Sequence, residues 1–141
     1  MLVRGEDSAI DKLVVENAES EKEFLNYISV MRAVKDKYEI DEMQKAIDAT
    51  VRGFADMVRV FPAATSVARG ERVIEAAFYG RARLEGNDNG YPSIVASGAH
   101  ACVLHWIKND GDVLPGDLIL IDAGVEAVSY THLTLPTILR V

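Results

Sequence analysis

Residues 116–126 read GDLILIDAGVE and decide the fold that the sequence predicts. Their apolar run, residues 118–121, is short and uninterrupted and follows a Pro-Gly-Asp turn, which is typical of a buried β-strand. Asp122 ends this strand and is followed by Ala123 and Gly124, so a carboxylate stands where the backbone allows close approach. An aspartate in this place is a metal ligand or general base about as often as it starts a turn. Both interpretations stay open on spacing alone.

A second strand is expected over residues 91–96, which read YPSIVA. The loop before it, residues 85–90, places Glu and Asn at the first positions of an EF-hand-like spacing. Position 12 of that pattern, which should be a bidentate glutamate, is Ala96. A turn rich in Asn and Gly therefore explains the loop better than a calcium site does.

Three helices are expected ahead of the strands, over residues 19–31, from Asp36 to just before Pro62, and over residues 70–84. The longest begins with a capping-box arrangement of Asp36 and Glu39. Its apolar residues recur in steps of three and four, which predicts that they form the buried face: Ile40, Met43, Ile47, Val51, Phe54 and Val58. Helices first and strands second indicate an α+β fold.

The composition limits the class of protein. The chain has 141 residues, 15 basic and 22 acidic side chains and a net charge of −7, which suits one soluble domain. The acidic balance argues against nucleic-acid or anionic-membrane partners, so small molecules, peptides or cations are favoured. A single cysteine and a start without an apolar signal segment predict a cytoplasmic location.

Cys102 and His105 are candidates for reactive groups. Cys102 lies between His100 and His105, but no recognisable nucleophile signature surrounds it, and a small buried apolar role is favoured. His105 stands in the apolar stretch VLHW before a polar loop. On the residues alone, a hydrogen-bonded histidine in the core or at its rim is favoured over a functional one.

Several motifs together resemble a known family. They are RAVKD at 32–36, YPSIVASG at 91–98, LHW at 104–106 and the stretch at 116–126, with His105 and Asp122 seventeen residues apart. In this order they resemble the pita-bread (creatinase/aminopeptidase P) metallopeptidases, and within that family the Xaa-Pro aminopeptidases, over roughly residues 30 to 126.

The resemblance implies a metal-dependent aminopeptidase that hydrolyses the N-terminal Xaa-Pro bond. Two divalent ions, manganese or cobalt, would share a bridging water. Family members use Asp, Asp, His, Glu and Glu as ligands, and Asp122 matches the first of them. His105 matches a catalytic, substrate-binding histidine that is not a ligand. The implied partners are peptides with proline in second position, not nucleic acid or membrane, and a homo-oligomer is compatible with the full-length protein.

The chain departs from the family pattern after residue 127. The second aspartate is expected at position 133, which is Leu133, and no acidic residue stands between 127 and 141. Residues 128–141 resemble the translation of a sequencing adapter; a genuine apolar terminal strand is the alternative. The sequence thus predicts the end of an N-terminal domain with a linker (1–35), the first half of a pita-bread domain (36–127) and a non-native tail (128–141).

With most metal ligands missing, this chain is expected to be an inactive fragment of the peptidase. Two other functions stay open. One is a prolidase- or creatinase-like hydrolase, which shares the fold. The other is a non-catalytic pita-bread module that binds a peptide, because loss of the second aspartate is what such a module would show.

Overall fold

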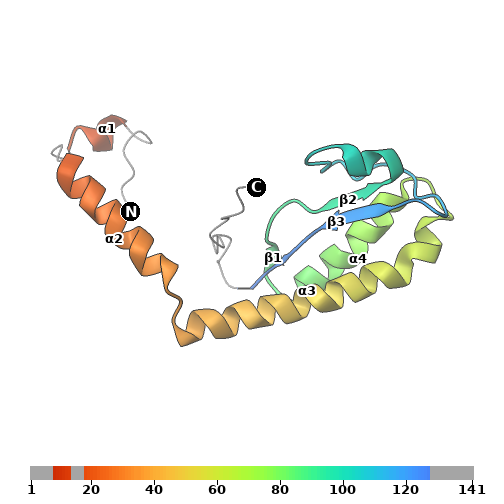
Figure 1. Cartoon of the computed structure of the whole chain (residues 1–141), viewed down its shortest axis with the longest axis horizontal. Coiled ribbons are helices and arrows are strands. Elements are labelled where there is room, and N and C mark those ends of the chain that lie inside the picture. The colour runs from red at the N-terminus through yellow and green to blue at the C-terminus, as the bar shows by residue number, and fades with distance from the viewer. Residues whose placement is uncertain (1–7, 14–17, 128–141) are drawn as a thin grey trace. The chain divides into compact units, whose positions relative to one another are not determined.

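The computed structural model describes residues 8–13 and 18–127 (Figure 1). The chain divides into two compact units, residues 1–36 and 37–141. The first unit contains α1 (Ser8–Asp11) and α2 (Ala18–Ala33), and α2 confirms the helix predicted over residues 19–31. The interpretation of residues 1–35 as the end of a preceding domain stays a prediction.

The second unit places two long helices beside short strands. α3 (Lys37–Ala64) and α4 (Gly70–Glu85) pack side by side, and the strands lie along them (Figure 1). The later elements are β1 (Asp88–Asn89), β2 (Ile94–Ser97), the 3₁₀ helix η1 (Gly98–Cys102), β3 (Ile119–Asp122) and β4 (Val125–Glu126). The predicted α+β class is confirmed. Within the described residues, no helix combines the length and apolar character needed to cross a membrane.

Both described sheets are antiparallel pairs. β2 pairs with β3 so that Ile94 lies opposite Asp122 and Ser97 lies opposite Ile119. β1 pairs with β4, with Asp88 opposite Glu126. The 3₁₀ helix and the loop that follows it thus connect the two strands of one sheet, and they leave and return at the same end of it.

The core forms where α3 and α4 meet. Phe78, Met57 and Ile74 are fully buried, and the Phe78 ring meets Phe54 edge to face with centroids 5.9 Å apart. A Cβ atom on Gly53 would lie 2.7 Å from the Phe78 ring. Glycine at position 53 therefore allows the two helices to approach closely.

The predicted buried face of α3 is wrong for four of its six residues, whereas Phe54 packs against the core as expected. Its buried residues are Ala49, Gly53, Met57 and Ala64, whereas four members of the predicted stripe are more than half exposed, namely Ile40, Ile47, Val51 and Val58. Small side chains let α4 pack against the α3 backbone, so they define the contact face. The larger aliphatic side chains lie on other sides of the helix.

Pro62 also departs from the prediction, because α3 continues past it to Ala64. A proline lacks only its own N–H donor, which would have bonded the carbonyl of Val58, four residues earlier. Pro62 lies in the last turn of α3, so the helix continues for only two residues beyond it. The hydroxyls of Thr65 and Ser66 both donate to the Pro62 carbonyl at 3.0 Å, so the helix ends with its last acceptors partly satisfied.

The strand at residues 118–121 was expected to be buried, and this is wrong for half of its residues. β3 alternates between half-buried and exposed positions: Ile119 and Ile121 pack on the core, whereas Leu118 and Leu120 are exposed. One face of the strand packs on the core, as in a one-sided antiparallel sheet.

The tail at residues 128–141, with Leu133, lies outside the described residues.

Candidate active site

Asp122 is held by a tyrosine from the facing strand region. It is the last residue of β3 and is exposed, and the Tyr91 hydroxyl donates a 2.6 Å hydrogen bond to its Oδ1. Burial raises the pKa of Tyr91, and the hydrogen bond to Asp122 raises it further, so this hydroxyl stays a donor at neutral pH. Gly124 is close to the Tyr91 ring, because a Cβ atom on it would lie 3.2 Å from the ring carbon Cε1. Tyr91, which sequence reasoning missed, therefore orients the carboxylate.

His105 stands in the turn after η1 and is exposed. Its backbone adopts a left-handed conformation with φ of 55°, which is uncommon for a residue with a side chain. The Ile107 N–H donates to the His105 carbonyl at 2.8 Å. Such conformations persist only where the surroundings hold them, and they cluster at functional sites.

Glu71, on the first turn of α4, is the polar centre of this region and is fully buried. Its Oε1 accepts from the Ser97 N–H at 2.8 Å and lies 2.9 Å from His100 Nδ1. Its Oε2 accepts from Trp106 Nε1 at 2.9 Å and from the Gly111 N–H at 2.7 Å. One carboxylate thus binds four points of the segment that contains His105.

The electrostatics keep Glu71 charged. Burial by itself would raise the pKa of its carboxyl, but the hydrogen bonds from Ser97, Trp106, His100 and Gly111 outweigh burial, and the pKa lies below its ordinary value near 4.5. With the carboxylate ionised, His100 Nδ1 carries the hydrogen and donates it. The buried charge is therefore fully solvated by protein donors.

Acid is expected to destabilise the chain through Glu71. Because folding lowers the pKa of this carboxyl, its contribution to the unfolding free energy is fully present above about pH 4.5 and is lost as the pH falls through the folded-state value. Urea unfolding of the wild type and of Glu71→Gln, followed by circular dichroism at pH 7, 4.5 and 3, checks this. The stability difference between the two should shrink with decreasing pH, and a difference that is the same at pH 7 and pH 3 would contradict the assignment.

Asn109 is a second buried polar residue that holds this loop. Like His105, it has a left-handed backbone. Its Oδ1 accepts from the Val95 N–H at 2.8 Å, and its Nδ2 donates to the Ser93 carbonyl at 2.9 Å and to Glu75 Oε1 at 2.8 Å. The loop is thereby fixed to β2 and to α4 at a point separate from Glu71.

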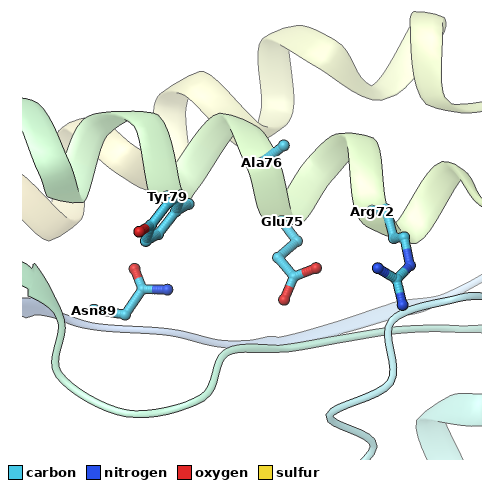
Figure 2. A pocket seen from close by; sticks show the side chains of 5 residues that line it. All are labelled: Arg72, Glu75, Ala76, Tyr79 and Asn89. Atoms are coloured by element: carbon cyan, nitrogen blue, oxygen red, sulfur yellow. The ribbon is translucent and has the colours of Figure 1, made fainter.

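A cavity of about 420 Å³ opens beside α4 (Figure 2). It is lined by Arg72, Glu75, Ala76, Tyr79 and Asn89, and the side chains of Arg72, Glu75 and Tyr79 extend from the side of α4 that faces Asn89. The Oδ1 atom of Asn89 is buried without a hydrogen-bond partner in the described part of the chain. Neither His105 nor Asp122 lines this cavity, so it is separate from the residues that the sequence singled out.

The described residues do not by themselves fit a two-metal centre. Over residues 8–13 and 18–127, no group of three or more His, Cys, Asp or Glu side chains is placed to hold a metal ion. Two ions need several carboxylate or imidazole ligands, and among the described residues the sequence singled out only Asp122 as a candidate ligand. Cys102 is exposed, so its expected burial is wrong: η1 carries it on the outside of a surface loop.

Comparison with known proteins gives the family context. The sequence profile of metallopeptidase family M24 matches residues 41–138. Xaa-Pro aminopeptidase 1 of Streptomyces coelicolor is 52% identical over 131 residues, which cover 92% of this chain and 26% of the relative. The chain thus spans about a quarter of the length of this relative.

Solved structures agree with the sequence relatives. X-Pro aminopeptidase from Thermotoga maritima MSB8 aligns with a TM-score of 0.64 at 31% identity, over 72% of this chain and 28% of that one. Zinc-substituted Escherichia coli aminopeptidase P in complex with product aligns with a TM-score of 0.55 at 29% identity, over 67% and 21%. The same enzyme with the inhibitor Pro-Leu has an equal TM-score.

These matches confirm the predicted fold, since about 70% of the chain aligns with the pita-bread structures of aminopeptidase P. Family M24 consists of metallopeptidases, which agrees with a carboxylate presented at the end of β3. Because the family profile covers more than half of its residues, the chain belongs to metallopeptidase family M24.

Proposed function

We propose that this chain is part of a metal-dependent aminopeptidase that hydrolyses the N-terminal Xaa-Pro bond of peptides. The observation that carries the proposal is Asp122 at the end of β3, fixed by Tyr91 at 2.6 Å and seventeen residues after a strained, exposed His105. The 52% identity to a protein named Xaa-Pro aminopeptidase 1 supports it, as does the Pro-Leu inhibitor bound to the Escherichia coli enzyme.

The two candidate residues receive different roles. Asp122 would be the first ligand of a pair of divalent ions, manganese or cobalt, and the remaining ligands would come from sequence after residue 127. Hard carboxylate oxygens suit such ions, and when bound the ions lower the pKa of a water molecule and polarise the attacked carbonyl. His105 would contact the substrate and stabilise charge at the scissile peptide. A reducing, cytoplasmic location is consistent with the single cysteine of the sequence.

We further propose that residues 128–141 are non-native. Reading the genomic DNA downstream of codon 127 tests this. An aspartate eleven positions after Asp122, followed by His and Glu ligands, supports the peptidase. Natural continuation through Leu133 contradicts the peptidase proposal and favours a non-catalytic module that binds peptides.

The activity is tested in a chimaera in which residues 18–127 replace the aligned segment of the Streptomyces coelicolor enzyme. With added manganese, the chimaera should release the first residue of an Xaa-Pro peptide and leave the matched Xaa-Ala peptide intact. The 141-residue chain should release neither, because it has one of the expected ligands. A folded chimaera without turnover, beside an active parent enzyme, would contradict the proposed function.

A further inference from the structure

We propose that Glu71 is a positioning residue for His105: its buried carboxylate fixes the loop of residues 97–111 and thereby the backbone position from which the imidazole projects. This inference rests on the proposed function for its catalytic consequence. The claim that Glu71 positions His105 depends only on the contacts described above.

The first argument is the number of bonds that one carboxylate makes. A carboxylate has about four acceptor sites, two on each oxygen, and Glu71 uses four. Ser97 and His100 lie on Oε1, and Trp106 and Gly111 lie on Oε2, all between 2.7 and 2.9 Å. Ser97 and Gly111 are the two ends of the loop, so Glu71 sets both its span and its shape.

The second argument is that His105 has no anchor of its own. Its side chain is exposed, and its imidazole makes no hydrogen bond to any other described residue. Its backbone is left-handed, which the surrounding structure must maintain. The adjacent residue, Trp106, donates to Glu71 and stacks on His100 with centroids 3.8 Å apart, so the restraint reaches His105 through its immediate neighbour.

The third argument is the close packing around the carboxylate. A Cβ atom on Gly111 would lie 2.5 Å from His100 Nδ1 and 2.8 Å from Glu71 Oε1, so a side chain at position 111 would push this cluster apart. The Glu71 N–H also donates to the Gly111 carbonyl at 3.1 Å. The loop is thus closed on Glu71 through both its main chain and its side chain, as a support for a functional group requires.

Glu71→Gln tests the hydrogen bonds of the carboxylate without changing the size of the side chain. It keeps the shape, but its amide nitrogen would face two N–H donors in place of the oxygen that accepts from them. Trp106→Phe is a milder second variant, because it keeps the ring on His100 and removes one donor. Glu85→Gln is the matched control, since Glu85 is on the same helix and its ion pairs go to Arg52 and Arg81, outside the loop.

The first experiment follows the His105 resonance in the 141-residue chain, labelled with ¹³C at histidine Cε1. The chain has three histidines, and His105→Ala identifies the signal. In Glu71→Gln the His105 signal should shift or split, with a smaller shift in the same direction for Trp106→Phe and none for Glu85→Gln. An unchanged His105 signal in both loop variants would overturn the inference.

The second experiment measures kinetics in the chimaera, per folded molecule. Glu71→Gln should lower kcat about ten- to a hundredfold and change KM less than threefold, because misplacing a catalytic group by about 1 Å has effects of this size. In a His105→Ala background the same substitution should lower kcat less than twofold further. Equal losses in both backgrounds would show that Glu71 is merely structural.

The two failures are distinguishable. An inactive wild-type chimaera contradicts the proposed function, and the His105 resonance still decides whether Glu71 positions that residue. An active wild-type chimaera with full activity in Glu71→Gln contradicts the positioning role and leaves the proposed function supported.

Discussion

Phe78→Ala is expected to lower the unfolding free energy of the chain by about 3 to 5 kcal/mol, the usual cost of truncating a fully buried phenylalanine. Phe78 has no exposed surface, meets Phe54 edge to face and fills the space above Gly53. A domain is stable by only about 5 to 15 kcal/mol, so this single change removes a large part of the total. Urea unfolding followed by circular dichroism measures it.

Val58→Ala is the control for this prediction. Val58 belongs to the stripe that its spacing suggested as core, but it is 60% exposed, so its truncation should change the unfolding free energy by no more than about 0.5 kcal/mol. A loss at Val58 as large as the loss at Phe78 would contradict the packing of α3 on α4.

Asp122→Ala in the chimaera is expected to lower kcat/KM by more than about a hundredfold. Changing groups that only orient a metal ligand already reduces metal affinity or activity ten- to a hundredfold, and Asp122 is proposed as a ligand itself. Tyr91→Phe removes only the 2.6 Å hydrogen bond to Asp122 and should lower kcat/KM about tenfold. The release of the first residue from an Xaa-Pro peptide, with manganese content measured on the same samples, checks both.

Asp88→Asn serves as the matched acidic control. Asp88 is partly exposed and lies 3.5 Å from Arg83 at the surface, so this variant should keep kcat/KM within twofold of the parent chimaera. Full activity of Asp122→Ala with unchanged manganese content would show that Asp122 is not a ligand.

Local patterns were sufficient for the three longer helices, for β3 and for the place of Asp122, but not for β1, which lies in the segment expected to be a turn, nor for η1 and β4. Helical spacing predicted α2, α3 and α4, and the apolar run before Asp122 predicted β3. These elements depend on neighbours three or four residues apart, or on the alternation and length of an apolar run, which a sequence displays directly.

Local patterns failed where the partner is distant in sequence. The size of Ile47 and Val51 suggested a core stripe, but the contact face of α3 is set by Ala49 and Gly53, which admit α4. The hydrophobicity of the α3 residues alone does not predict which face of α3 contacts α4. The useful signal was the pair of small residues Ala49 and Gly53, four positions apart and in line with the buried Met57.

Glu71 was missed for the same reason. Its four partners lie 26 to 40 residues further along the chain, and a glutamate in the first turn of a helix is ordinarily a response to the helix dipole. Nothing in its own neighbourhood distinguishes it from Glu75. Tyr91 was read as part of a strand, and its link to Asp122 depends on the pairing of β2 with β3.

The central claim, that Asp122 is a metal ligand of an M24 peptidase, is tested most directly by crystals of the manganese-loaded chimaera. An anomalous difference map at the manganese edge should show a peak in contact with the Asp122 carboxylate, with the Tyr91 hydroxyl still bonded to Oδ1. Manganese bound elsewhere, with the Asp122 carboxylate outside its coordination sphere in an active chimaera, would contradict the account.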